Sequence, residues 1–268
     1  MSIAFKKSKL ALNYIDSGTG DITLVFLHYF GGSSRTWSYV TDELNGEFRC
    51  IAIDIHGFGD SPSSVKGLSV SDNAQSVADV ITHLQLKKYV VIGHSMGAKI
   101  ALSLASHKPF GLKKLMLFAP SPPTPEPMSD EEKTQLITAY NNRPGLIKII
   151  NHITSIPLAN FDINNLVNDN LRASSTAWKS WIEHGSQEDI SLKMSGVNIP
   201  VLVINGQYDK KFSSDFLRNE FEKYFRNVHF EEIREAGHLL PIEAPLAVAK
   251  LIRESVNNKE IVSNNTIS

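Results

Sequence analysis

The sequence of 268 residues predicts an α/β protein with a mostly parallel sheet. Three observations lead to this class. Several short runs are continuously apolar, which is typical of strands buried on both faces. Helix-length amphipathic stretches alternate with these runs, as they do in strand–helix–strand units. A long segment without strand character interrupts the alternation in the second half of the chain.

The expected elements follow in chain order. Residues 3–18 alternate apolar and polar positions, and the stretch ends in Gly18, Thr19 and Gly20, which indicates an antiparallel hairpin. The continuous apolar runs that predict buried strands are residues 22–28, 50–55, 89–94, 114–120 and 200–207. The segments with helical spacing are residues 69–86, 96–107 and 244–255. These helices are expected to cover the two faces of the sheet.

The interrupting segment runs from Ser121 to about residue 195 and opens with a proline-rich stretch. The helical candidates within it are residues 130–141, 144–154, 163–173 and 175–186. A structureless loop of this length is improbable in a compact domain, so a helical insertion is expected. We therefore predict a core of residues 1–120 and 197–257, a helical cap of residues 121–196 and a flexible tail of residues 258–268.

Composition excludes several classes of protein. A net charge of −1 gives no electrostatic reason to expect nucleic acid or an anionic membrane as partner. The nine histidines show no metal-site spacing, and Cys50 is the only cysteine, so we expect no metal and a buried thiol. No segment resembles a cleaved signal or a membrane span, which favours a cytoplasmic protein. Its oligomeric state is left open.

A serine flanked by glycines stands between a predicted strand and a predicted helix, in the sequence GHSMG at residues 93–97. A serine hydroxyl attacks a carbonyl only when it protrudes and a neighbouring base removes its proton. A sharp strand-to-helix turn makes the serine protrude at a strained backbone conformation, and the helix amino terminus favours negative charge beside it. This context predicts Ser95 as a nucleophile.

The partners of such a serine are an acid and a histidine, in the chain order Ser, Asp or Glu, His. Asp209 follows the last buried strand, where loops on a parallel sheet carry function. His238 follows Gly237 in a loop before the last helix. We predict Asp209 as the acid and His238 as the base.

These motifs resemble those of the α/β-hydrolase fold family, and the similarity covers nearly the whole chain. The resemblance rests on HYFGG (28–32), DIHGFGDS (54–61), GHSMG (93–97), NGQYD (205–209) and GHLLPIEAP (237–245). It implies a mostly parallel eight-stranded sheet with the cap inserted after the sixth strand, and no cofactor. It also implies that the backbone amides of Phe30 and Met96 form an oxyanion hole.

Several other residues are assigned by position. Tyr29 stands where the family usually has glycine, so we predict an ordinary negative φ there and a ring along the pocket wall. Trp37, Trp178 and Trp181 are candidates for substrate contact, with core packing as the alternative. A further set is expected to shape loops or to act as scaffolding: Asp54, Gly57, Gly59, Ser61, His28 and His94.

The expected activity is acyl transfer to water. In the family, aspartate at the position of Ser95 serves epoxide opening and dehalogenation, so a serine points instead to hydrolysis of small to medium apolar carboxylic esters through an acyl-enzyme. Three alternatives remain. A lactone, including an acyl-homoserine lactone, is a cyclic ester; a C–C bond hydrolase uses the same triad; and a protein of this fold can bind a small molecule without catalysis.

Overall fold

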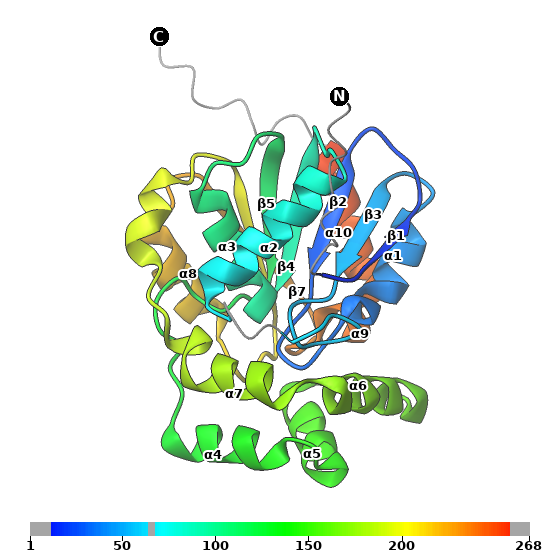
Figure 1. Ribbon diagram of the computed structural model, residues 1–268, viewed down its shortest axis with the longest axis vertical. Coiled ribbons are helices and arrows are strands. Elements are labelled where there is room, and N and C mark those ends of the chain that lie inside the picture. Colours follow the sequence, from blue (N-terminus) through cyan, green and yellow to red (C-terminus); the bar gives the residue numbers. More distant parts are fainter. Residues whose placement is uncertain (1–11, 64–67, 258–268) are drawn as a thin grey trace, which may run out of the picture.

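The strands form one open, mostly parallel sheet. The computed structural model describes residues 12–63 and 68–257 (Figure 1). The sheet within these residues has seven strands in the order β1-β3-β2-β4-β5-β6-β7. Their bounds are β1 Tyr14–Ser17, β2 Thr23–Leu27, β3 Arg49–Ile53, β4 Tyr89–His94, β5 Leu112–Phe118, β6 Val201–Gly206 and β7 Val228–Ile233. Only β1 runs antiparallel, beside β3. The predicted fold class is confirmed.

The strand count differs from the expected eight. The first arm of the predicted hairpin falls mostly on residues 1–11, which lie outside the described residues, as does the predicted tail of residues 258–268. The helical insertion therefore follows the fifth described strand, β5, rather than a sixth. The second arm of the hairpin is β1, and the partner that the structure gives it is β3.

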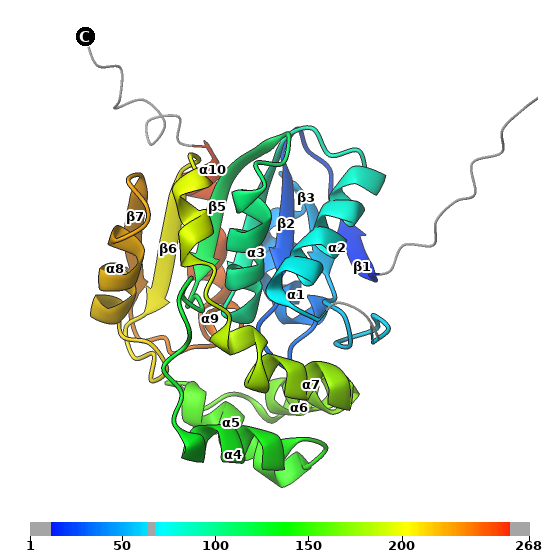
Figure 2. The same cartoon turned by 60° about the vertical axis from the view of Figure 1, so that its left-hand side comes forward.

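Helices cover both faces of the sheet, which explains the continuous apolar runs. Successive strand side chains point to opposite faces, so each parallel strand needs apolar residues at every position. One face packs against α2 (Val70–His83), α3 (Met96–Ser106) and α8 (Ser214–Glu222). The other packs against α1 (Ser38–Leu44) and α10 (Pro245–Asn257) (Figure 2). Cys50 is buried in this second layer, and burial raises the pKa of its thiol to about 12.

Four helices lie across the carboxyl ends of the parallel strands (Figure 1), and we refer to them as the cap. They are α4 Asp130–Ala139, α5 Arg143–Ile153, α6 Asn160–Arg172 and α7 Ser175–Glu183. Side chains of Ser129, Asn142 and Ser174 accept hydrogen bonds from the first turns of α4, α5 and α7, so these helices begin where capping residues occur. The α6 helix begins at Asn160, earlier than the predicted residue 163. The prediction missed this start because Ala159, which precedes the helix, has no side chain that can cap it.

Asp54 organises the loop that follows β3, as its position in the sequence predicted. The carboxylate is fully buried and accepts hydrogen bonds from the Ser34 N–H at 2.6 Å and from the Asp60 N–H and the Asn13 amide at 2.9 Å. Burial opposes ionisation, but these donors outweigh it and hold the pKa of Asp54 below its ordinary value. Gly59 has a φ of +56°, and because it has no side chain it leaves room for this carboxylate.

Asp54→Asn should destabilise the fold, because an amide group would then face N–H donors. We expect the free energy of unfolding at pH 7 to fall by about 1–3 kcal/mol. The pKa of Asp54 is lower in the folded chain, so its contribution is complete above about pH 4 and is lost as the pH falls through the folded pKa.

Urea unfolding at pH 7 and pH 3 measures this difference between wild type and variant, which should shrink at the lower pH. The exposed Asp21→Asn is the control and should change neither value. An Asp54→Asn effect of equal size at both pH values would contradict the assignment of a charged, hydrogen-bonded carboxylate.

Candidate active site

Ser95 lies in the sharp turn between β4 and α3. Its backbone takes φ 51° and ψ −113°, a conformation that is strained for any residue except glycine. The flanking glycines are required for close approach. A side chain at Gly93 would collide with the backbone of Ala98, and one at Gly97 would collide with the carbonyl groups of Leu27 and His28. The turn can therefore form only with these small residues.

The structure brings Ser95, Asp209 and His238 together from three separate loops. The Ser95 hydroxyl lies 3.0 Å from His238 Nε2, and His238 Nδ1 lies 2.8 Å from Asp209 Oδ2. Ser95 follows β4, Asp209 follows β6 and His238 lies between β7 and α9 (Leu240–Glu243). Parallel strands place these loops at one edge of the sheet. The arrangement is a continuous hydrogen-bonded chain from hydroxyl to carboxylate.

Asp209 is held as a carboxylate. Its side chain is fully buried, and its second oxygen, Oδ1, accepts hydrogen bonds from the backbone N–H groups of Lys211 at 2.7 Å and Phe212 at 3.2 Å. Burial alone would raise its pKa, but His238 and these two amides outweigh burial and lower the pKa of Asp209. The acid is thus charged and fixed in orientation.

Backbone contacts hold His238 from two sides. Its N–H donates to the carbonyl of Ile153 in the cap at 2.9 Å, and its own carbonyl accepts from His94 Nε2 at 2.7 Å. His94 is fully buried, and burial together with the nearby His238 lowers the pKa of His94 to about 3. A neutral His94 with its proton on Nε2 therefore supports His238.

The loop after β2 carries the Phe30 amide. His28 shapes this loop: its Nε2 accepts from the Ile55 N–H at 3.0 Å, so its Nδ1 carries the proton that Tyr29 O accepts at 2.7 Å. Tyr29 has a negative φ, and Gly31 provides the left-handed conformation at φ +85°. Both agree with the predicted path of the loop.

The Phe30 and Met96 amides have free N–H groups near the Ser95 turn. In the described part of the chain, the Phe30 N–H in the loop and the Met96 N–H at the start of α3 donate to no backbone acceptor. Met96 is the first residue of α3, and the first N–H groups of a helix have no partner within it. Two donors of this kind are suited to stabilise negative charge on an oxygen.

A cavity of about 80 Å³ lies between the Ser95 turn and the cap. Its walls are mostly apolar and include Tyr29, Trp178 and Trp181. The Tyr29 ring lies 5.3 Å from the His94 ring, and its hydroxyl is 3.4 Å from the Asn170 amide nitrogen. Burial raises the pKa of Tyr29, so the hydroxyl stays neutral. Tyr29 therefore lies along the wall that was expected from its position.

Trp37 lies elsewhere. Its ring is fully buried on the face of the sheet that α1 and α10 cover. The ring centroid lies 5.1 Å from that of Phe26 and 5.9 Å from that of Phe118. It does not line the cavity beside Ser95. Of the three tryptophan candidates for substrate contact, Trp37 is thus a packing residue, because its ring belongs to the buried cluster on the face of the sheet that α1 and α10 cover.

The structure also places charged side chains at the cavity that the sequence patterns did not single out. Lys211 Nζ lies 3.2 Å from Glu126 and 3.0 Å from Glu132. Burial disfavours its charge, but the two glutamates outweigh burial and raise the pKa of Lys211. The side chain of Glu126 is 1% exposed. No local sequence pattern predicts this buried ion pair between Glu126, which precedes α4, and Lys211 in the loop after β6.

Lys99 is a second charged residue that sequence reasoning missed. It is fully buried in α3, where its ammonium donates to the carbonyls of Thr124 and Ser186 at 3.0 and 3.1 Å. Burial lowers the pKa of Lys99 to about 8, although Glu126 opposes this. The only sign of this buried charge in the sequence is a single lysine within an otherwise apolar predicted helix.

The described residues show neither a metal-binding cluster nor a membrane-spanning helix. Across residues 12–63 and 68–257, no group of three histidine, cysteine, aspartate or glutamate side chains is arranged to hold a metal ion. None of the helices in these ranges combines the length and apolar character that crossing a membrane requires.

Comparison with known proteins agrees with this architecture. The family model described as alpha/beta hydrolase fold matches residues 22–146. A Bacillus subtilis protein provisionally named 2-succinyl-6-hydroxy-2,4-cyclohexadiene-1-carboxylate synthase is 26% identical over 86% of this chain and 89% of its own. Epoxide hydrolase 3 of Xenopus tropicalis is 24% identical over 98% of this chain and 79% of its own.

Solved structures show the same arrangement of elements. An esterase from Exiguobacterium antarcticum superimposes with a TM-score of 0.84 at 21% sequence identity, covering 92% of this chain and 96% of its own. At 21% sequence identity, this structural similarity shows a shared fold and nothing further. The chain therefore has the α/β-hydrolase fold.

Proposed function

We propose that the protein is a serine hydrolase that cleaves carboxylic esters, with Ser95 as nucleophile, His238 as base and Asp209 as acid. The observation that carries the proposal is the hydrogen-bonded chain from the Ser95 hydroxyl through His238 to Asp209, at 3.0 and 2.8 Å. It begins at a residue whose strained turn exposes its oxygen to the cavity. Buried polar groups aligned in this way suit proton transfer from a nucleophile.

The proposed reaction has two halves. In the first, Ser95 Oγ bonds to the ester carbonyl carbon while His238 Nε2 takes its proton, and the Phe30 and Met96 amides hold the oxyanion. The C–O bond then breaks, and His238 returns the proton to the departing alcohol. In the second half, His238 removes a proton from water, which attacks the acyl carbon. The bond from this carbon to Ser95 Oγ then breaks, His238 returns the proton to Ser95, and the acid is released. Asp209 keeps the His238 Nδ1 proton in place throughout.

The cavity supports a small acyl group. A volume of about 80 Å³ corresponds to on the order of six water-sized groups, since one needs roughly 10–15 Å³. Its apolar lining favours hydrocarbon over charged substituents next to the scissile carbonyl. Acetyl to butyryl esters are therefore the proposed substrates. We expect the loops and helices at the mouth of the cavity to select the alcohol portion of the ester.

Related reactions are separated by one screen. A lactone of matched size needs the same groups, so it is assayed beside the open-chain esters. An epoxide is included because one relative bears the name epoxide hydrolase, and a serine in the turn is expected to leave it unchanged. Labelling by a fluorophosphonate distinguishes an enzyme from an inert binding protein, because only an activated serine is phosphonylated.

Ser95→Ala should lower kcat/KM for a short ester by about 10⁶-fold, as loss of the nucleophile does in other serine hydrolases. Labelling by the fluorophosphonate should disappear. The matched control is Ser103→Ala, which removes a buried hydroxyl from the same helix and should leave both readouts intact. Residual activity above a few per cent in Ser95→Ala would contradict the assignment.

Asp209→Asn should lower kcat by about 10⁴-fold, because His238 loses the partner that orients its ring and stabilises its charge. Thermal unfolding should show that the variant remains folded. Asp54→Asn is the comparison, since Asp54 is a second buried carboxylate after a strand but does not contact His238. A larger loss of kcat in Asp54→Asn than in Asp209→Asn would identify Asp54 as the acid instead.

Trp181→Ala should enlarge the cavity and shift the preference toward longer acyl chains. We expect the ratio of kcat/KM for hexanoyl over acetyl esters to rise by at least about tenfold, because a single methylene group in an apolar pocket is worth roughly 10- to 200-fold. Trp37→Phe is the control: its ring packs in the core, so stability should fall while the ratio stays unchanged. Equal losses on all esters in Trp181→Ala would assign that side chain to packing alone.

A further inference from the structure

We infer that Asp169 of the cap is a positioning residue that holds the oxyanion loop, which we define as residues 28–34. This inference rests on the proposed function, since the loop carries the Phe30 amide of the proposed oxyanion hole. The central contact joins distant parts of the chain. The Ser33 hydroxyl donates to Asp169 Oδ2 at 2.7 Å, and both residues are buried.

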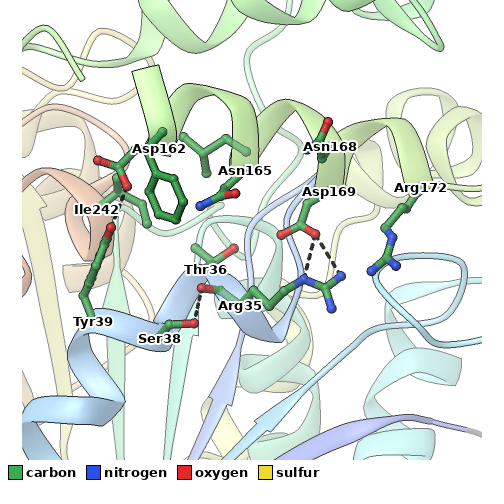
Figure 3. Close-up of a pocket in the computed structure, with 12 residues that line it drawn as sticks. Arg35, Thr36, Ser38, Tyr39, Asp162, Asn165, Asn168, Asp169, Arg172 and Ile242 are labelled. Atoms are coloured by element: carbon green, nitrogen blue, oxygen red, sulfur yellow. Dashed lines mark hydrogen bonds and ion pairs between the residues drawn. The ribbon is translucent and has the colours of Figure 1, made fainter. Parts of the chain in front are cut away.

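The second carboxylate oxygen holds the residue that follows the loop. Asp169 Oδ1 accepts from Arg35 Nε at 2.9 Å and lies 2.8 Å from Arg35 Nη2. Figure 3 shows the carboxylate on α6 directly facing this guanidinium. Arg35 is itself fixed by Asp60, at 2.9 Å from Nη1. Charge-assisted hydrogen bonds of this kind are stronger than neutral ones, so one cap side chain fixes the carboxyl-terminal end of the loop.

The next residue of α6 contacts the other end of the loop. The Asn170 amide nitrogen lies 3.4 Å from the Tyr29 hydroxyl. A side chain at Gly31, which has φ +85°, would collide with the Asn170 amide. Asp169 and Asn170 therefore contact the loop on both sides of Phe30, and the Asn170 side chain leaves no room for a side chain at Gly31.

The position of the Phe30 N–H depends on this packing. An oxyanion donor acts only when it lies within hydrogen-bonding distance of the developing charge, and an error of about 0.5 Å weakens it. The Phe30 ring also packs on Trp178 of α7, with ring centroids 4.4 Å apart. If Asp169 is removed, Ser33 loses its acceptor, Arg35 loses one of its two carboxylates, and the loop is no longer fixed at this end.

Asp162 provides a matched control on the same helix. Its carboxylate accepts a hydrogen bond at 2.7 Å from the hydroxyl of Tyr39, which belongs to α1 (Figure 3). This contact also joins α6 to the core, and both contacts line the same cleft. However, it does not touch residues 28–34. Asp162→Ala therefore removes a contact between cap and core while leaving the oxyanion loop alone.

The experiment compares Asp169→Ala, Asp169→Asn and Asp162→Ala on a short-chain ester and on a trifluoromethyl ketone of matched acyl length, whose adduct with Ser95 carries an oxyanion. Asp169→Ala should lower kcat by about 10- to 100-fold with little change in KM, less than the 10²–10³ loss on deleting an oxyanion donor. The Ki of the ketone should rise by the same factor by which kcat/KM falls. Asp169→Asn should recover part of the loss, because its oxygen can still accept from Ser33.

Hydrogen exchange of the amides in residues 29–34 provides a readout that does not depend on catalysis. It should be faster in Asp169→Ala than in wild type or Asp162→Ala. If Asp169→Ala does not fold, Ser33→Ala removes the same hydrogen bond from the other side and replaces it in each measurement.

Unchanged kcat and Ki in Asp169→Ala, or losses of equal size in Asp162→Ala, would overturn the inference. If the wild type hydrolyses no ester but exchange still rises in Asp169→Ala, the proposed function fails while the hold of Asp169 on the loop stands. If the wild type is active and exchange is unchanged, the inference fails and the proposed function stands.

Discussion

The tightest constraint in the molecule is the close packing of the Ser95 turn against its neighbours. Gly97 lies against the carbonyl groups at the end of β2, where no other residue type fits. The Ser95 N–H donates to Phe118 at the end of β5, and the Ser95 carbonyl accepts from Ser121. The turn is thus bonded to one neighbouring strand and packed on the other. Because these contacts fix it from both sides, the strained φ of Ser95 persists.

The other groups of the site are arranged around this fixed point. His238 reaches the Ser95 hydroxyl from the loop after β7, and its backbone is held by His94, the residue directly before Ser95. The loop after β2 passes beside Gly97 and continues to Phe30. One strand end therefore carries the nucleophile, the support for the base and the surface on which the oxyanion loop rests. Rigid elements of this kind position a site more accurately than isolated loops.

The cap contributes to the geometry of the site as well as to its walls. Ile153 accepts from the His238 N–H, and Asp169 accepts from the Ser33 hydroxyl. In addition, Glu132 of α4 pairs with Lys211 of the core. Three separate polar contacts thus join cap helices to the loops that surround Ser95. Among these contacts, the bond between Ser33 and Asp169 has both partners buried, which makes it costly to break.

The fold class and the need for glycines on both sides of Ser95 could be recognised from the sequence without coordinates. Continuous apolar runs arise because strands covered on both faces bury every side chain, and this burial is visible in any window of the chain. Likewise, the glycines around Ser95 and the capping residues of α4, α5 and α7 act on their own neighbours. These signals are local, so they could be interpreted without coordinates.

Contacts between side chains that are distant in the sequence depend on the tertiary structure. The pair of Asp169 with Ser33, the pair of Lys211 with Glu126 and the burial of Lys99 join segments whose sequences carry no complementary pattern. Trp37 and Trp181 are equally aromatic in the sequence, yet one packs behind the sheet and the other lines the cavity. Helix orientation over the sheet decides this, and it results from the packing of the whole core rather than from any one segment.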